Sequence, residues 1–383
     1  MGEQGPQRDP LLIWARRNQP ALIAQIREFV ECESPSDSPV ELQRFMGLLI
    51  EAVSGMASTR FTGAGALICK FKLPGPRRKK GQVLALGHAD TVWPMGTLRS
   101  MPFRRAEGRL WGPGVLDMKA GLAFFIHAMR ALMELEIAVP HDVVLLVNPD
   151  EETGSKRSRA GTEALAKKSH AVLVLEPGTG LEGRVKTARK GIGAYKLTVH
   201  GIAAHAGVDF AKGASAVLEL ARQIEAVAEF NDHTRGVTVN PGVIAGGTRS
   251  NVIAAEASAE IDIRVPTVAE AHALGRKFRA LKPFDRRCKL EITGGLNRPP
   301  MERRPGLFER ARTIAKDLGV TLEESATGGG SDGNFTAALG VPTLDGLGAV
   351  GQGAHAAHES ILIDRIPDRV ALLAHLTQKI ELS

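Results

Sequence analysis

Aromatic side chains are scarce in this 383-residue sequence: they make up 4% of it, and Tyr195 is its single tyrosine. Proteins that bind single-stranded nucleic acid stack the bases on several exposed rings, so we expect no such surface here. The net charge is +7, yet the densest basic run is Arg77–Lys80, in a Pro/Gly-rich stretch between two apolar segments. Such a run is typical of a solvated turn, and we expect no nucleic acid partner.

Cysteines and long apolar runs are also few. Cys32, Cys69 and Cys288 lie far apart and form no Cys-x-x-Cys pair, which indicates separate thiols in a reducing compartment. No apolar run approaches the roughly 20 residues needed to cross a bilayer. The N-terminus lacks the basic and apolar segments of a secretory signal, although a signal removed earlier would leave no trace. The sequence therefore predicts a cytoplasmic protein with no membrane partner.

In the first half of the chain, strand-like and helical segments alternate as in an α/β protein. Apolar strand-like runs at 82–87, 141–152 and 171–177 alternate with helical patterns, the longest at 117–136. This alternation is typical of a mostly parallel sheet with helices on both faces. The composition, 43% hydrophobic and 24% charged, is that of a globular protein, and the length allows one large domain or two.

The pattern changes between 190 and 299. Strand-like segments there alternate apolar with polar residues, as half-exposed antiparallel strands do, and helical patterns near 214–229 and 269–281 separate them. From 300 to 383 the alternation of helix and strand resumes. We therefore predict an α/β domain formed by 1–189 and 300–383, with a two-layer α+β module inserted at 190–299.

Histidines and carboxylates follow five of the apolar runs of the α/β part. In chain order they are His88 with Asp90, Asp117, Asp150 with Glu151 and Glu152, Glu176, and His355 with His358. Because ligands bind beyond the carboxyl ends of parallel strands, these side chains are expected to meet at one edge of the sheet. Taken alone, a His-x-Asp sequence is often no more than a pair of polar residues in a loop. An Asp-Glu-Glu sequence is often the solvent-exposed first turn of a helix.

Taken together, these residues favour a site for two divalent transition metals. Imidazole nitrogen and carboxylate oxygen are the ligands of zinc, with cobalt or manganese as substitutes, whereas magnesium prefers oxygen alone. Two histidines, one bridging aspartate and two further carboxylates would supply three protein ligands to each ion. One acid remains that could transfer protons.

Five motifs resemble, in order, those of the dinuclear zinc aminoacylase/carboxypeptidase metallopeptidase family. They are GHADTVWPMGTL, GRLWGPGVLDMKAG, NPDEETGS, LEP and GAHAAHE. The resemblance runs from about Ile23 to Ile380 and is nearest to the glutamate carboxypeptidases of the carboxypeptidase G type. The family also includes acetylornithine deacetylase, succinyl-diaminopimelate desuccinylase and the aminoacylases.

The resemblance implies a role for each metal-site residue. His88 and Glu176 would bind one zinc ion, and Asp117 would bridge it to the second. Asp90 would orient the ring of His88. The second ion would take Glu152 and His355, Glu151 would be the general base, and His358 would take no part.

The resemblance also identifies the inserted module as a lid that carries the contact of a homodimer. Its His205 would reach the partner subunit's active site and stabilise the oxyanion. Asn251 and Arg264 stand at positions associated with substrate binding. Gly329 belongs to a Gly-rich segment, TGGGSDGNF, that would line the substrate pocket or form a flexible turn.

The predicted reaction is hydrolysis of an amide without a covalent intermediate. Arg298 would bind the carboxylate of a small peptide or an N-acyl amino acid, although Arg303 competes for this role. We expect a carboxypeptidase-like enzyme that releases a C-terminal amino acid, with glutamate-type products plausible. The alternatives are a biosynthetic N-deacylase, such as acetylornithine deacetylase or succinyl-diaminopimelate desuccinylase, and an inactive binding protein on the same fold.

Overall fold

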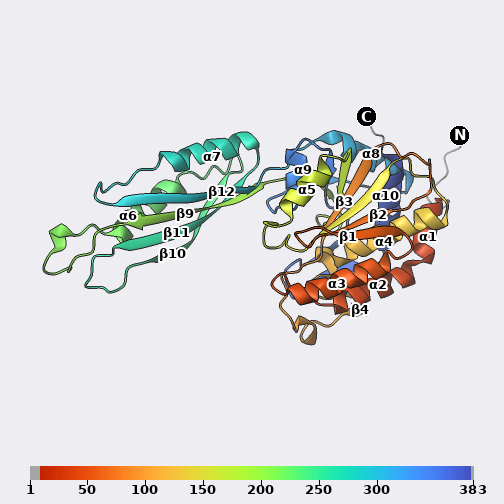
Figure 1. Cartoon of the computed structure of the whole chain (residues 1–383), viewed down its shortest axis with the longest axis horizontal. Coiled ribbons are helices and arrows are strands. Elements are labelled where there is room, and N and C mark those ends of the chain that lie inside the picture. Colours follow the sequence, from red (N-terminus) through yellow and green to blue (C-terminus); the bar gives the residue numbers. More distant parts are fainter. Residues whose placement is uncertain (1–8, 381–383) are drawn as a thin grey trace. The chain divides into compact units, whose positions relative to one another are not determined.

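The computed structural model describes residues 9–380, which form two compact units (Figure 1). Unit 1 comprises the chain up to Ala188, Arg303–Ala326 and the chain from Ser331 onward. Unit 2 comprises Arg189–Glu302 and Thr327–Gly330. The predicted insertion, 190–299, lies inside unit 2, which also takes in part of the Gly-rich segment.

That short addition has a local cause. The backbone N–H of Lys190 donates to the carbonyl of Thr327 at 2.9 Å. The guanidinium of Arg189 donates to the carbonyls of Gly329 and Gly330 at 3.2 and 3.0 Å. These long-range hydrogen bonds hold Thr327–Gly330 against the start of unit 2, and sequence patterns do not reveal them.

The main sheet of unit 1 has six strands in the order β1 (Ala57–Phe61), β2 (Leu67–Phe71), β6 (Asp142–Asn148), β3 (Gln82–His88), β7 (Ala171–Val174) and β14 (Thr343–Leu344). From β6 to β14 each neighbouring pair is parallel. The β1–β2 and β2–β6 pairs at the other edge are antiparallel. The prediction of a mostly parallel sheet is confirmed.

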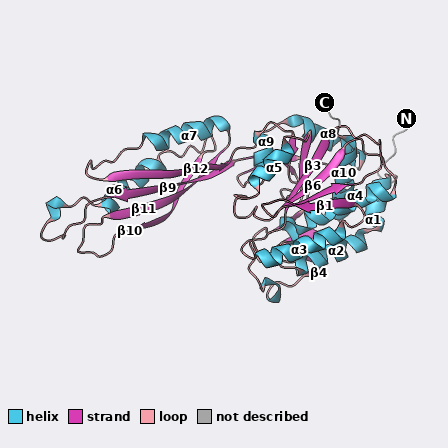
Figure 2. Ribbon diagram, viewed as in Figure 1, coloured by secondary structure: helices cyan, strands magenta, loops and turns pink. Residues whose placement is uncertain are grey.

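Helices cover both faces of this sheet (Figures 1 and 2). They are α1 (Pro10–Arg17), α2 (Gln19–Glu31), α3 (Pro39–Ala52), α4 (Ala120–Glu134), α5 (Arg159–Ala166), α8 (Pro305–Asp317), α9 (Gly333–Ala338) and α10 (Ile366–Lys379). Successive residues of a strand point to opposite faces. Thus Val83 and Ala85 join the core under α1, α4 and α10, whereas Leu84 and Leu86 join a second core with Ala166 of α5.

Two smaller sheets were not predicted. One has the order β15 (Gly351–Gln352), β16 (Ser360–Leu362), β5 (Arg109–Trp111) and β4 (Arg104–Ala106), and the other pairs β8 (Val185–Arg189) with β13 (Glu324–Thr327). The runs before Asp117 and His355 were expected to end at the edge of the main sheet. The run before Asp117 instead forms β5 of the first small sheet, so this prediction was wrong for Asp117. The run before His355 begins as β14 of the main sheet, as predicted, but it continues into β15 of the small sheet before it reaches His355.

Unit 2 is a two-layer module. Its antiparallel sheet has the order β10 (Thr238–Gly246), β11 (Glu256–Val265), β9 (Gly191–His200) and β12 (Lys289–Arg298). The helices α6 (Ala216–Ala228) and α7 (Val268–Ala280) pack on the sheet through one hydrophobic core, in which Leu220 and Phe278 are fully buried. The predicted α+β architecture of this module is confirmed.

Cys32, Cys69 and Cys288 are unpaired and buried, as predicted for separate thiols. Among residues 9–380, the structure contains no helix with the length and apolar character required to span a membrane.

Candidate metal centre

The carboxyl ends of three adjacent parallel strands form the floor of the candidate site. His88 is the last residue of β3 and lies beside Asn148, the last residue of β6. Glu151 and Glu152 follow β6 in the next turn, and Glu176 follows β7. Since β6, β3 and β7 are neighbours in this order, their polar ends meet at one edge of the sheet.

Asp117 lies between the two predicted histidines. Its Oδ1 is 3.2 Å from Nε2 of His88, and its Oδ2 is 3.3 Å from Nε2 of His355. Each histidine also faces a second carboxylate. His88 Nε2 is 3.5 Å from Glu176 Oε1, and His355 Nε2 is 3.4 Å from Glu152 Oε2. The five residues thus form two groups that share one aspartate.

Asp117 and His355 reach this edge from turns rather than from strands of the main sheet. Asp117 lies in the turn Val115–Lys119 that leads into α4, and its own backbone angles, φ −118° and ψ 93°, are not helical. Gly114, which precedes that turn, has φ +71°, and a Cβ there would lie 2.7 Å from Cγ2 of Thr91. Glycine therefore suits both the conformation and the space at this position. His355 follows β15 and itself has φ +60°, which is uncommon for a residue with a side chain.

Asp90 contacts both the ring of His88 and the turn after β6. His88 Nδ1 lies 2.9 Å from the carbonyl oxygen of Asp90 and 3.4 Å from its carboxylate Oδ1. The same carboxylate accepts hydrogen bonds from the backbone N–H groups of Glu151 and Glu152, each at 3.1 Å, and from the hydroxyl of Ser36 at 2.8 Å. Asp90 therefore holds both the ring of His88 and the turn that carries the two glutamates.

The electrostatics of the cluster favour positive charge. Burial alone would lower the pKa of His88, but the carboxylates of Asp117, Asp90 and Glu176 outweigh burial and raise it well above its usual value. Asp117 and Glu152 raise the pKa of His355 to about 10. Burial would raise the pKa of Asp117, but the two histidines outweigh it and hold that pKa far below its usual range. The surroundings therefore suit a bound cation.

The donor set fits bound divalent metal. Ligand atoms of His88, Asp117 and Glu152 lie within 4.8 Å of one another, as do those of His88, Glu151 and Glu176. The Oε1 atom of Glu152 is buried and has no hydrogen-bond partner among residues 9–380. A buried carboxylate oxygen without a hydrogen bond is costly in free energy, and a metal ion would satisfy it.

Glu151 stands beside these groups. Its side chain is 9% exposed, and its carboxylate approaches the ligand atoms of His88 and Glu176. The backbone bond from Glu151 to Asp90 fixes the position of this side chain relative to the cluster. A carboxylate at the edge of such a site is suited to exchange a proton with a reacting molecule.

Unit 2 brings two of its predicted site residues together. The segments around His205 and Asn251 form an antiparallel pair, in which Ala206 N–H donates to the carbonyl of Asn251 at 3.0 Å. Both His205 and Asn251 are exposed. The ring of His205 accepts a hydrogen bond from the N–H of Gly207 at 3.1 Å, so the ring has a defined orientation within unit 2.

The other predicted binding residues of unit 2 have different surroundings. Arg264 already contacts a carboxylate of its own chain, because Nε and Nη2 donate to Asp262 at 2.8 and 3.0 Å. Gly329 is exposed. Arg298 is only 4% exposed and lies beneath the Gly-rich segment, where a Cβ on Gly330 would lie 2.8 Å from its Cδ. The alternative anchor, Arg303, is paired with Glu324 in unit 1 at 2.8 Å.

The sequence analysis assigned no role to Asp332, which supports the turn after β6. This buried carboxylate accepts hydrogen bonds from Nδ2 of Asn148 at 2.6 Å and from the hydroxyl of Ser155. Asn148 and Ser155 are the first and last residues of the NPDEETGS motif. The sequence holds one signal for a structural role of Asp332. It belongs to a Ser-Asp pair inside the Gly-rich segment, and such residues often precede a helix.

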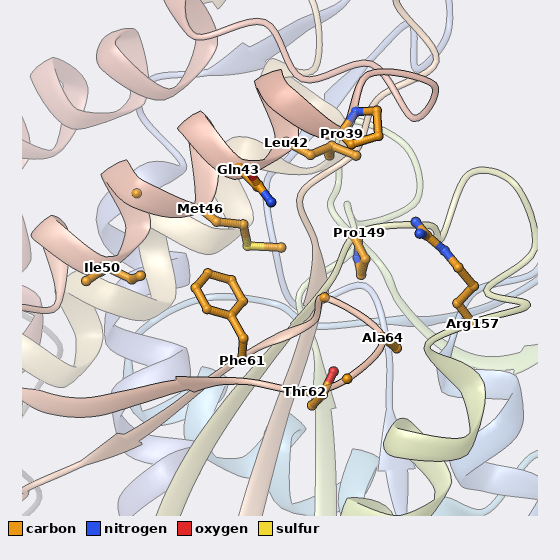
Figure 3. Close-up of a pocket in the computed structure, with 13 residues that line it drawn as sticks. Pro39, Leu42, Gln43, Met46, Ile50, Phe61, Thr62, Ala64, Pro149 and Arg157 are labelled. Atoms are coloured by element: carbon orange, nitrogen blue, oxygen red, sulfur yellow. The ribbon is translucent and has the colours of Figure 1, made fainter.

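A cavity of about 550 Å³ lies beside the same turn, between α3 and the β1–β2 connection (Figure 3). Leu42, Met46 and Phe61 line it, and Pro149 and Arg157 stand at its other side (Figure 3). The residues that line it include no histidine and no carboxylate. The groups that could perform hydrolysis therefore lie in the Asp117 cluster, and this cavity is only its neighbour.

Comparison with known proteins agrees with this arrangement. Residues 84–379 match the model of peptidase family M20/M25/M40. The chain belongs to this family. It is 29% identical over 384 residues to carboxypeptidase G2 of Pseudomonas sp. (strain RS-16), an alignment that covers 96% of this chain and 92% of that protein. It is 28% identical over 312 residues to succinyl-diaminopimelate desuccinylase of Dechloromonas aromatica (strain RCB), with 77% and 82% covered.

A solved structure shares the fold. It is the YXEP protein of Bacillus subtilis, described as a dinuclear metal-binding peptidase of the M20 family, with a TM-score of 0.69 and 15% identity over 94% of this chain and 98% of that one. As a member of the M20 family, the protein is a metal-dependent hydrolase of amide bonds, of the metallo-carboxypeptidase or N-acyl deacylase kind. The prediction of an enzyme is confirmed, and the inactive binding protein is set aside.

Proposed function

We propose that the protein is a zinc-dependent, carboxypeptidase-like hydrolase that releases a C-terminal amino acid from a small peptide or an N-acyl amino acid. The observation that carries this proposal is the placement of Asp117 between His88 and His355, each of which faces a further carboxylate. The mixed nitrogen and oxygen donors support zinc, with cobalt or manganese as substitutes.

Two ions per subunit are proposed to be held by the two halves of the cluster. His88, Asp117 and Glu176 would bind the first, and Asp117, Glu152 and His355 the second. When bound, the pair would supply Lewis acidity that polarises the amide carbonyl and acidifies the attacking water. The similarity to a dinuclear metal-binding peptidase supports this count.

Glu151 is proposed to move the proton. Its carboxylate would accept a proton from the attacking water and then donate it to the leaving nitrogen. Asp90 would keep Glu151 in place through the backbone bond described above and would fix the ring of His88. The reaction then needs no covalent intermediate, because the chain supplies a base rather than a nucleophile.

Unit 2 is proposed to act as the lid and to form a homodimer. Several large apolar side chains of unit 2 are exposed, among them Val208, Phe210, Val243 and Ile244, and such surfaces often become buried in an interface. In the dimer, His205 would reach the active site of the other subunit and donate a hydrogen bond to the oxyanion. Asn251 and Arg264 would contact the substrate.

The substrate is proposed to carry a free carboxylate, with glutamate-type leaving groups favoured. Arg298 is the proposed anchor because a guanidinium binds a carboxylate through two parallel hydrogen bonds, and the backbone of Gly329 would line the same pocket. The extensive similarity to carboxypeptidase G2 supports this substrate class. The buried, unpaired thiols support a cytoplasmic location.

A biosynthetic N-deacylase is the second candidate. It is favoured by one observation, the 28% identity to succinyl-diaminopimelate desuccinylase over most of the chain. The metal cluster would serve both reactions equally, since both hydrolyse an amide. The two candidates differ only in the groups that recognise the substrate.

The test is amino-acid release from N-acyl-glutamate and from N-acetylornithine, with and without a chelator. We expect the zinc-loaded protein to release glutamate, and the chelator to abolish the release. Release from N-acetylornithine alone would assign the protein to the deacylases. No release from either substrate by protein that holds two zinc ions would contradict the proposed substrate class.

A further inference from the structure

Glu359 is a buried carboxylate for which the proposed chemistry has no use. It lies four residues after His355, at the start of the strand-forming segment that becomes β16, and its side chain is fully buried. Neither histidine of the cluster contacts it, and it is not among the proposed metal ligands. A carboxylate is placed in a protein interior only if several donors compensate for the loss of water.

Four hydrogen bonds offset part of that loss, although burial still raises the pKa of Glu359. Oε1 accepts from the backbone N–H groups of Leu116 and Asp117 at 2.8 and 3.1 Å. Oε2 accepts from the N–H of Gly114 at 2.9 Å and from Nε1 of Trp93 at 2.8 Å. The N–H groups of Gly114, Leu116 and Asp117 converge on this one carboxylate, so the turn that presents Asp117 forms a small backbone nest.

These contacts join three segments that are distant in sequence. Trp93 belongs to the segment after His88, Gly114–Asp117 carries the shared aspartate, and Glu359 belongs to the segment of His355. The backbone adds to the connection, because Gly112 N–H donates to the carbonyl of Glu359 at 3.4 Å and Glu359 N–H donates to the carbonyl of Ala356 at 2.9 Å. One side chain therefore sets the spacing between the turns of Asp117 and His355.

The backbone of His355 shows why such a connection is needed. Its φ of +60° is an unfavourable conformation for histidine, and it persists only where the surroundings fix it. A backbone bond from Gly112 and the pairing of β16 with β5 also join the two segments. The Glu359 carboxylate adds the side-chain hydrogen bonds to the turn of Asp117 itself, and its loss is expected to loosen the separation between Oδ2 of Asp117 and Nε2 of His355.

We propose that Glu359 is a positioning residue that holds Asp117 and His355 at the spacing required by the second metal ion. This inference rests on the proposed function, because it presupposes a metal at the cluster. The second ion takes two ligands from the turns that Glu359 joins, Asp117 and His355, whereas the first takes only Asp117. Loss of Glu359 is thus expected to weaken the binding of the second ion and to leave the binding of the first ion nearly unchanged.

The experiment measures the two zinc dissociation constants of the full-length protein by competition with a chromophoric chelator. In Glu359→Gln, whose amide presents N–H groups to backbone donors, we expect one constant to rise about 10- to 100-fold, as for other residues that support metal ligands. The other constant should stay near its wild-type value. His358→Ala, an exposed change one residue away, is the matched control and should leave both constants unchanged.

The outcomes separate this proposal from the proposed function. A wild-type protein that binds no zinc would contradict the proposed function itself. A wild type with two bound ions and a Glu359→Gln variant with unaltered constants, even if its metal-free form melts lower, would show that Glu359 only stabilises the fold. If Glu359→Gln does not fold, Glu359→Asp decides: its shorter side chain cannot span both pairs of donors, so unaltered constants there would equally overturn the proposal.

Discussion

Three predicted site residues of unit 1 and two of unit 2 have opposite surroundings. In unit 1, His88, Asp90 and Glu176 are 2%, 1% and 7% exposed, and hydrogen bonds from the same unit fix them. In unit 2, His205 and Asn251 are exposed. Unit 1 therefore contains a cluster that is complete within one chain, whereas these residues of unit 2 face outward, as expected for groups that contact a substrate or a second subunit.

The arginines of unit 2 do not follow this contrast. Arg264 of unit 2 has its guanidinium on Asp262, and Arg298 is buried, so neither presents a free fork at the surface. A carboxylate substrate would have to replace a contact or open the cover above Arg298. Substrate recognition by unit 2 is thus expected to require movement of side chains or loops. Catalysis by unit 1 is expected to require very little such movement.

The largest effect should come from the base in unit 1. Glu151→Gln keeps the shape of the side chain but removes its ability to accept a proton, so kcat should fall about 10²- to 10⁴-fold. Metal content should remain at the wild-type value. Steady-state kinetics with metal analysis measures both, and Glu51→Gln on the exposed surface of α3 is the control. Near-normal kcat in Glu151→Gln would assign proton transfer to another group.

The next effect tests whether unit 2 acts across a dimer. His205→Ala should lower kcat about 10²- to 10³-fold, the usual cost of removing an oxyanion donor, without loss of metal. A one-to-one mixture of His205→Ala and Glu151→Gln subunits should recover about a quarter of wild-type activity, because half of the dimers regain one complete site. A mixture that recovers nothing would mean that His205 serves its own subunit or no site.

Substrate anchoring gives a smaller change. Arg298→Lys keeps the charge but loses the planar fork, and KM for N-acyl-glutamate should rise about 10-fold or more, since a hydrogen bond to a charged group contributes about 1.5–3 kcal/mol. Arg303→Lys is the matched variant and should leave KM unchanged. The reverse result would move the anchor to Arg303 and weaken the case for a role of unit 2 in anchoring.

Metal binding should stabilise one unit only. At a zinc concentration 100 times both dissociation constants, each of the two proposed ions contributes about 2.7 kcal/mol to the unit that binds it. Because each unit has its own hydrophobic core, calorimetry should resolve two transitions, with the transition of unit 1 about 10 °C higher in zinc than in chelator. A shift of the unit 2 transition alone would place the metal elsewhere.

Acid should also act mainly on unit 1. Burial, helped by Arg130, lowers the pKa of His127 to about 3, so the folded protein keeps this ring neutral while the unfolded chain protonates it near pH 6.5. The stability contributed by the neutral ring is therefore complete above about pH 6.5 and falls by about 1.4 kcal/mol per pH unit down to about pH 3. Urea unfolding gives the free energy of unfolding of the metal-free wild type and of His127→Phe at each pH. Between about pH 3 and about pH 6.5 the wild-type value should depend on pH more steeply by this amount, and two parallel curves would contradict the prediction.

Much of the site could be predicted because it depends on local order. His88, Glu151, Glu152 and Glu176 follow buried strands whose apolar runs are plain in the sequence, and the parallel order of β6, β3 and β7 brings them together. The source of Asp117 and His355 could not be predicted. Their turns belong to a sheet whose strands have two or three residues, too short to show any periodicity.

Other features depend on contacts that no sequence pattern encodes. The four donors around Glu359 come from backbone N–H groups and one indole, and backbone groups carry no sequence signal. The inclusion of Thr327–Gly330 in unit 2 depends on hydrogen bonds to Arg189 and Lys190. Long-range hydrogen bonds of this kind determine the details of the site, whereas hydrophobic patterning determines the fold.

The distribution of the proposed ligands along the chain has a consequence for synthesis. They stand at positions 88, 117, 152, 176 and 355, on either side of the segment that forms unit 2. A growing polypeptide can complete unit 2 on the ribosome while its hydrolytic centre still lacks His355 and the α10 part of its core. With these ligands, hydrolysis of an amide has to wait until the ribosome has made His355, after the last residue of unit 2.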